Sequence, residues 1–157
     1  MGLKKKGYRL HQFEKQEMIV ICEPKDSYGW YEKMLNFTVD VFKQLDIPVR
    51  KLEICSGDLA DLKAKSADVE AWSPRRKKYF EVGSCSNLTD AQARRLNIRI
   101  ENKGEKHFAH TLNNTVLASP RALIALMENN QQKDGSIKVP KVLWKYTGFK
   151  GIKPKKK

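Results

Sequence analysis

The sequence predicts an α+β fold in which a mainly antiparallel β-sheet is flanked by helices. Segments with the length and composition of strands mostly follow one another, and the longer helical patterns are interspersed irregularly. With 157 residues, of which 40% are hydrophobic, the chain is long enough to form one domain around one core. This order of elements favours an antiparallel sheet over the parallel sheet of a doubly wound fold.

The first elements follow from hydrophobic patterns and helix-breaking residues. Residues 8–22 are predicted to form a strand because they end in a continuous, β-branched apolar run. Pro24 ends that strand, and an amphipathic helix is expected at residues 28–45, followed by a strand at 49–55. The apolar positions of the helix, spaced three or four residues apart, are Trp30, Met34, Phe37, Val41 and Leu45.

Shorter elements are expected in the middle of the chain. Residues 59–66 are small and polar and predict a short helix. Residues 67–72 and 79–83 are predicted to be two strands joined by a basic turn at residues 75–78. A helical turn is expected at residues 91–96, after a capping pair of polar residues.

The last third of the chain is predicted to form a hairpin, an extended segment and a helix. Residues 98–101 and 107–112 pair around a turn that contains Gly104. Residues 113–118 continue extended into a helix at 119–130, which begins with a proline in its first turn. The apolar face of this helix is expected to comprise Leu123, Ile124 and Met127.

The end of the chain changes in composition. Residues from 148 onward are rich in lysine, with glycine and proline, and we expect a loose basic tail there. We therefore assign residues 1–148 to one domain and residues 149–157 to the tail.

The strongest bulk signal is a net charge of +13, from 31 Lys and Arg against 18 Asp and Glu. Such a charge attracts polyanions such as RNA, DNA, nucleotides or an anionic membrane, although it also promotes solubility alone. No apolar run is long enough for a transmembrane helix, and the N-terminus lacks the apolar stretch of a signal peptide. We expect no membrane partner.

The cysteines favour a reducing compartment. There are three of them, Cys22, Cys55 and Cys85, without a CxxC pair or a nearby pair of histidines. A structural zinc site is therefore not expected, and the predicted location is the cytoplasm.

Residues 9–17 combine cations, an aromatic ring and a carboxylate. In a strand, alternate residues share a face, so Arg9, Phe13, Lys15 and Glu17 are expected to point the same way, together with His11. The four residues from Phe13 to Glu17 span roughly 13 Å, which matches the reach of an aminoacyl-adenylate from base to amino group. Phe13 can stack on a base, Arg9 or Lys15 can meet a phosphate, and Glu17 can hold an ammonium group. The alternative is a solvated strand face with one exposed phenylalanine.

Two further segments are candidates for ligand contacts. The sequence EVGSCSN, at residues 81–87, has an acid and small hydroxyl residues suited to a metal-bound phosphate, and Cys85 is expected to be a buried structural residue. In an extended chain, Asn113, Thr115 and Leu117 share a face and can hydrogen-bond a small polar ligand. Arg121 opens a helix, where a cation is unfavourable unless an anion lies beside it.

These segments resemble those of seryl-tRNA synthetases, a class II aminoacyl-tRNA synthetase family. The resemblance runs from about Tyr8 to Tyr146. It is carried, in order and spacing, by YRLHQFEKQEM, DLADLKAKSADVEAW, EVGSCSNLTDAQARRLNIR and HTLNNTVLASPRALIALMENNQQKDGSIKVPKVL. It implies a class II synthetase-type sheet and ATP-dependent activation of serine, followed by transfer to tRNA(Ser), with ATP and Mg²⁺ as cofactors.

The resemblance also implies roles for particular residues in ATP binding. Arg9 matches a position that contacts the ATP phosphates, and Phe13 one that stacks on adenine. Glu81 and Ser84 match positions that bind ATP and its metal ion, and Arg121 matches the arginine of class II motif 3. Arg9 and Arg121 are thus the implied catalytic residues. Val82 and Gly83 lie in the same ATP-binding segment, although the family commonly has a hydroxyl residue where Gly83 stands.

The serine-binding residues implied by the resemblance are Glu17, Asn113 and Thr115. Glu17 matches the position that binds the amino group of serine. Asn113 and Thr115 match positions that recognise serine, and the family often has Ser at the Thr115 position.

The resemblance implies that the catalytic domain is N-terminally incomplete in this chain, and we expect weak or no activity from the chain alone. The helical hairpin that grips tRNA, motif 1 and the first strand of motif 2 would precede these residues. Expected partners are serine, ATP and tRNA(Ser), with a second copy or a missing N-terminal half. Two alternatives remain open: a nucleotide- or RNA-binding paralogue without catalysis, and an aminoacyl transferase to a carrier protein.

Overall fold

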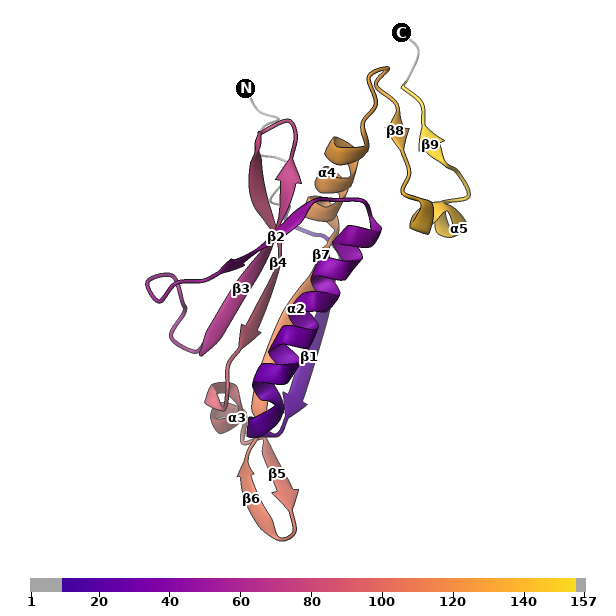
Figure 1. Cartoon of the computed structure of the whole chain (residues 1–157). Coiled ribbons are helices and arrows are strands. Elements are labelled where there is room, and N and C mark those ends of the chain that lie inside the picture. The colour runs from indigo at the N-terminus through magenta and orange to yellow at the C-terminus, as the bar shows by residue number, and fades with distance from the viewer. Residues whose placement is uncertain (1–9, 155–157) are drawn as a thin grey trace.

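Five antiparallel strands form the main sheet of the protein, in the order β1-β7-β4-β3-β2 (Figure 1). The computed structural model describes residues 10–154. The predicted mainly antiparallel α+β fold is confirmed, since all four strand pairings of this sheet are antiparallel. The strands are β1 (Lys15–Cys22), β2 (Val49–Glu53), β3 (Lys65–Ser73), β4 (Lys78–Asn87) and β7 (His110–Ala118).

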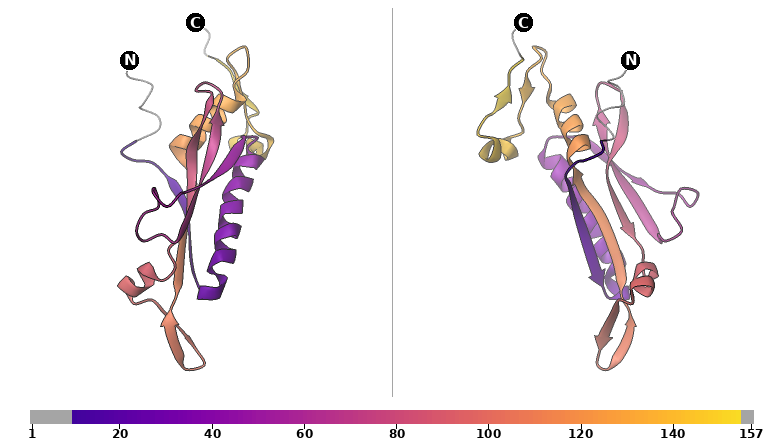
Figure 2. Two further views of the ribbon diagram at one scale, coloured as in Figure 1. Left: turned by 60° about the vertical axis from the view of Figure 1, so that its left-hand side comes forward. Right: turned by 180° about the vertical axis from the view of Figure 1, so that it is seen from behind.

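One long helix, α2 (Ser27–Gln44), covers one face of this sheet and follows the short helix η1 (Pro24–Asp26) (Figures 1 and 2). The buried face of α2 is shifted by about one residue from the face that the apolar spacing predicted. Tyr31 and Phe42 are fully buried, whereas Phe37 is 44% exposed, so the prediction was wrong for Phe37. Met34 and Leu45 are buried as expected.

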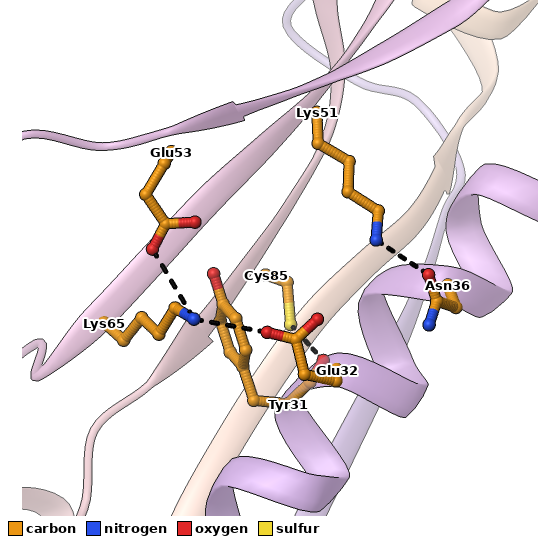
Figure 3. Close-up of polar contacts among 7 residues, drawn as sticks. All are labelled: Tyr31, Glu32, Asn36, Lys51, Glu53, Lys65 and Cys85. Atoms are coloured by element: carbon orange, nitrogen blue, oxygen red, sulfur yellow. Dashed lines mark hydrogen bonds and ion pairs between the residues drawn. The ribbon is translucent and has the colours of Figure 1, made fainter.

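Polar contacts join α2 to the β2–β3 edge (Figure 3). The Lys65 ammonium lies 3.2 Å from Glu32 on α2 and 3.7 Å from Glu53 on β2. It also lies 4.8 Å from the centre of the Tyr31 ring, above the core. Exposed ion pairs of this kind add little stability singly, so apolar burial under α2 supplies most of the attachment.

Strand β4 is longer than the sequence predicted, and the expected helix at residues 59–66 is absent. Residues 56–58 and 61–62 form turns, and β4 continues to Asn87 rather than ending at residue 83. Its polar residues are accommodated because β4 is paired on both sides and two of its groups accept hydrogen bonds from nearby segments, although Asn87 Nδ2 has no hydrogen-bond partner among the described residues. Ser66 Oγ donates to the Cys85 carbonyl at 3.1 Å, and Asn87 Oδ1 accepts from the Thr89 amide at 2.9 Å.

A separate hairpin projects from one end of the sheet (Figure 1). It consists of β5 (Arg99–Asn102) and β6 (Glu105–Phe108), and it follows the short helix α3 (Ala91–Leu96). Gly104 has φ +86° at its turn, a conformation that favours glycine. The helical turn and the presence of a hairpin are confirmed, but residues 110–112, predicted to belong to its second strand, lie in β7 of the main sheet.

Helix α4 (Ser119–Asn130) has the predicted bounds, but a different face of it is buried. Ala122 and Ala125 pack in the core, whereas Leu123 is 55% and Met127 43% exposed. Small residues face the sheet because α4 lies close to it. Ile124 packs against the core as expected.

The C-terminal segment forms a second small hairpin. Strand β8 (Ile137–Lys138) pairs with β9 (Gly151–Ile152), and η2 (Lys141–Leu143) and α5 (Trp144–Thr147) lie between them. The expectation of a loose tail is therefore wrong for residues 151–152, and the domain division at residue 148 stays a prediction. Across residues 10–154, no helix has both the length and the apolar character needed to span a bilayer.

Candidate functional site

The face of the sheet opposite α2 carries polar side chains from four neighbouring strands. Met18 and Val20 on β1 pack against the core, so the alternate residues Glu17 and Ile19 point away from α2. On β3, buried Val69 likewise alternates with half-buried acids. We call this surface the open face; it carries Glu17, Asp68, Glu70, Glu81, Ser84, Asn113 and Thr115.

A bulge between β1 and β7 determines which residues of β7 reach the open face. Glu17 pairs with Thr115 and Gln16 with Leu117, so Val116 is the extra residue. Thr115 therefore shares the open face with Glu17, whereas Leu117 packs against the core. The prediction that Leu117 shares a face with Thr115 was wrong, because the bulge reverses the alternation.

A second bulge lies between β3 and β4. Val69 pairs with Gly83 and Glu70 with Glu81, which leaves Val82 as the extra residue. Val82 is 1% exposed and belongs to the core. As a result Glu81 and Ser84, although three residues apart, both lie on the open face. The two residues predicted to contact metal-bound ATP are thus brought to one surface.

Glu17 is held in place by two hydrogen-bond donors. Thr115 Oγ1 donates to Glu17 Oε2 at 2.8 Å, and Lys15 Nζ lies 2.8 Å from the same oxygen. The Glu17 side chain retains 26% exposure, so the carboxylate is oriented and still accessible. Such a carboxylate can accept charge-assisted hydrogen bonds from an ammonium group. Asn113 lies two residues before Thr115 on β7, paired with Ile19.

A pocket of 290 Å³ adjoins this carboxylate. Phe13, Lys15, Thr115, Glu81 and Arg121 are among the residues that line it. Phe13 is 48% exposed and precedes β1, so the predicted strand alternation does not extend back to it. The pocket nevertheless brings the aromatic ring and Arg121 to one site. Val82 and Gly83 also line the pocket.

Arg121 has the anionic neighbour that its position requires. Its Nη1 lies 2.8 Å from Glu81 Oε2 and donates to the Glu81 carbonyl at 3.0 Å. The side chain remains 26% exposed beside the pocket. This contact ties the first turn of α4 to β4. Because a guanidinium has five donors, the remaining ones can meet an anionic ligand.

Asp68 is an open-face residue to which the sequence analysis assigned no role. Burial raises its pKa above 3.8, a hydrogen bond from Ser84 offsets part of that effect, and the Glu81 carboxylate adds to the increase. The signal that points to Asp68 is the alternation of acids with Val69 and Ala71 in a strand.

The oxygen donors near Ser84 suit a hard cation in type. Glu81, Asp68 and Ser84 supply carboxylate and hydroxyl oxygens, and a cation would offset the charge that raises the pKa of Asp68. Within residues 10–154, no group of three His, Cys, Asp or Glu is arranged to hold a metal ion by itself. These donors therefore fit Mg²⁺ that arrives bound to phosphate oxygens, as it does with nucleotides.

Gly83 allows a close approach at the base of the pocket. A Cβ at this position would lie 2.6 Å from the Thr115 carbonyl oxygen and 2.9 Å from Thr38 Cγ2. Both distances are shorter than side chains normally tolerate. Thr38, on α2, thus occupies the space into which a hydroxyl residue at position 83 would project.

Cys85 is structural, as expected. It is fully buried, and its Sγ donates to the Tyr31 carbonyl at 3.7 Å (Figure 3). Burial, with smaller contributions from Glu32 and Glu17, raises the pKa of its thiol to about 12. A thiol with this pKa is a poor nucleophile near neutral pH. Arg9, the other predicted catalytic residue, lies outside the described residues.

The fold and the site together define the class of protein. The model of the tRNA synthetase class II core domain (G, H, P, S and T) matches residues 3–130, so the chain belongs to this family. Within it, the chain is similar to proteins named serine–tRNA ligase. It is 48% identical over 152 residues to that of Pyrococcus horikoshii and 53% identical over 150 residues to that of Dictyoglomus thermophilum.

These alignments cover 96% and 95% of this chain but 33% and 35% of the relatives. The chain thus spans about a third of the length of these relatives.

Solved structures agree with these relatives. The seryl-tRNA synthetase from Pyrococcus horikoshii complexed with ATP superposes with a TM-score of 0.94 at 47% identity, over 97% of this chain and 34% of that one. A cytoplasmic serine–tRNA ligase from Naegleria fowleri in complex with AMP has a TM-score of 0.88 at 41% identity, over 95% and 36%. The resemblance found in the sequence is confirmed.

Proposed function

We propose that this chain forms the ATP- and serine-binding part of a serine–tRNA ligase. The observation that carries the proposal is the Glu17–Thr115 pair, which lies beside a pocket lined by Phe13, Glu81 and Arg121. This arrangement offers a carboxylate for an ammonium group and, next to it, an aromatic ring and a guanidinium for a nucleotide. Two similar structures are complexes with ATP and AMP, which supports a nucleotide in this pocket.

In this proposal the residues act mainly by positioning and by stabilising charge. Glu17 binds the amino group of serine, and Thr115 and Asn113 recognise the rest of the amino acid. Phe13 stacks on adenine, and Arg9 and Arg121 bind phosphate oxygens. The serine carboxylate then attacks the α-phosphorus, pyrophosphate leaves, and seryl-adenylate forms without a covalent bond to the protein.

Magnesium bound to ATP would supply charge neutralisation at the phosphates, near Glu81 and Ser84. In the same proposal Asp68 orients the Ser84 hydroxyl, because the two side chains are hydrogen-bonded. In the second step a terminal ribose hydroxyl of tRNA(Ser) accepts the seryl group. A cytoplasmic location, and assembly with a second copy or with the remainder of the domain, stay predictions.

ATP–pyrophosphate exchange tests this function directly. Because the chain spans about a third of the length of its relatives, we expect weak exchange, which depends on serine and is lost in Arg121→Ala because the variant removes a donor to the phosphates. The matched control is Arg95→Ala, an exposed arginine on α3, which is expected to exchange at the unaltered rate. Exchange that alanine supports as well as serine, or that survives in Arg121→Ala, would contradict the proposal.

A further inference from the structure

Positive charge is concentrated at one end of the molecule. The β3–β4 turn, residues 74–78, and the C-terminal segment, residues 128–154, together hold ten Lys and Arg but only two acids. The other described residues hold 14 Lys and Arg and 16 acids. All ten cations are exposed. The excess charge of the described chain is thus local; we call these two segments the cationic end.

The two acids of the cationic end are already engaged. Glu128 pairs with Arg75 at 3.0 Å and accepts a hydrogen bond from Ser73. Asp134 accepts hydrogen bonds from the backbone and hydroxyl of Ser136 at 3.0 and 2.7 Å. Glu128 is therefore paired within the cationic end, whereas Asp134 keeps its negative charge beside the hairpin, where the lysines outnumber it.

Two hollows run along the cationic end and share one residue. The first, of 330 Å³, is lined by Arg75, Gln132 and Lys133. The second, of 490 Å³, is lined by Gln132 together with Lys138, Lys150 and Lys153 of the β8–β9 hairpin. Five cations and the Gln132 amide thus form an exposed track from the β3–β4 turn to the hairpin, and one carboxylate lines each hollow, Glu128 the first and Asp134 the second.

The position of this track relates it to the candidate site. Strands β3 and β4 carry Glu70 and Glu81 on the open face and continue into the β3–β4 turn. Helix α4 carries Arg121 in its first turn beside the pocket, and Glu128 in its last turn lines the first hollow of the track. The cationic end lies opposite the projecting β5–β6 hairpin (Figure 2). A long polyanion on the track can therefore reach toward the pocket.

We infer that the cationic end binds the phosphate backbone of RNA. A linear array of Lys and Arg with a side-chain amide matches the donors that contact phosphates. Exposed aromatic rings lie on the same segment: Tyr146 is 73% and Phe149 48% exposed, and rings of this kind can stack on unpaired bases. Donors that line grooves favour RNA over a flat lipid surface. The inference rests on the proposed function only for which RNA is bound.

The test is fluorescence anisotropy with a labelled serine tRNA transcript, measured over a range of salt concentrations. We compare the chain with the double variant Lys133→Glu/Lys153→Glu. The matched control is Arg95→Glu/Lys103→Glu, which makes the same change in net charge near the β5–β6 hairpin. The logarithm of the binding constant falls linearly with the logarithm of the salt concentration, and each lost phosphate contact makes this slope about 1 less steep. For Lys133→Glu/Lys153→Glu we therefore expect weaker RNA binding and a slope that is less steep by about 2. Neither effect is expected in the control.

Equal losses in both double variants would overturn the inference, because net charge alone would then explain binding. Unaltered RNA binding in Lys133→Glu/Lys153→Glu would also overturn it. So would loss of binding to phosphatidylserine vesicles in this variant without a loss of RNA binding. Binding of a non-hydrolysable seryl-adenylate analogue, measured in parallel, separates the two proposals. If the chain binds the analogue and the double variant binds RNA as well as the unaltered chain does, the inference about the cationic end fails and the proposed function stands. If the chain does not bind the analogue but the double variant loses RNA binding, the proposed function fails and the inference stands.

Discussion

Gly83→Ala should destabilise the fold and distort the candidate site. The new Cβ would lie 2.6 Å from the Thr115 carbonyl oxygen and 2.9 Å from Thr38 Cγ2. Thr38 is fully buried and hydrogen-bonded to Asn114 at 2.8 Å, so it cannot move freely. Overpacking of this kind costs about 1–3 kcal/mol. For a domain of this size, that corresponds to a fall in Tm of roughly 2–12 °C.

Urea denaturation measures this cost. Gly57→Ala is the matched control, because a Cβ there has no atom within 4 Å. The free energy of unfolding is expected to fall for Gly83→Ala and to stay within about 0.5 kcal/mol for the control. A Gly83→Ala protein as stable as the unaltered chain would refute the packing argument.

A double-mutant cycle with Thr38→Ser tests the contact itself. Serine keeps the hydroxyl that bonds Asn114 but lacks the Cγ2 methyl group. Thr38→Ser should therefore offset part of the cost of Gly83→Ala, by about 0.5–1.5 kcal/mol, while the contact with the Thr115 carbonyl remains. Strictly additive effects of the two substitutions would show that Thr38 does not limit the space at Gly83.

Three further predictions concern the site and the core. Thr115→Val removes the hydrogen bond to Glu17 and should weaken serine-dependent exchange by raising the KM for serine. Thr115→Ser keeps the hydroxyl and should keep the KM of the unaltered chain. Equal KM values for Thr115→Val and the unaltered chain would contradict the role of the hydroxyl. Burial lowers the pKa of His110 below 6.5 in the folded chain. As the pH falls, the unfolded chain therefore binds a proton at this residue before the folded chain does. The stability that neutral His110 contributes is thus lost as the pH falls below about 6.5. Urea titrations at several pH values should show that the free energy of unfolding falls less with decreasing pH in His110→Asn than in the unaltered chain. An identical fall in both proteins would show that His110 does not cause this pH dependence. Exposed Cys55 should react with a thiol reagent in the folded chain, while Cys85 should react only on unfolding; labelling of Cys85 in the folded state would contradict its burial.

The sequence predicts local features of this fold well. The bounds of α4 follow from Pro120 in the first turn and the end of the preceding extended segment. Glu17, Thr115 and Arg121 were predicted as ligand-contacting residues, and the structure places all three on or beside the open face. These signals depend on neighbouring residues in the chain, so a single sequence contains them.

Features that depend on pairing between distant segments could not be predicted in this way. The bulges at Val116 and Val82 decide which residues reach the open face, and each arises from the register of paired strands, which is distant in the chain for β1 and β7 and local for β3 and β4. The length of β4 likewise depends on partners on both sides. Leu123 and Met127 were expected inside because they are large, yet close packing of α4 favours Ala122 and Ala125.

The central claim is that the carboxylate of Glu17 and the adjoining pocket together bind a seryl-adenylate. Isothermal titration calorimetry with a non-hydrolysable seryl-adenylate analogue tests it most directly, with Glu17→Gln as the variant and Glu14→Gln, an exposed glutamate that precedes β1, as the control. Loss of a hydrogen bond to a charged group predicts binding weaker by about 1.5–3 kcal/mol, or roughly 10–150-fold in Kd, for Glu17→Gln only. Equal affinity of the unaltered chain and Glu17→Gln for the analogue would contradict the account.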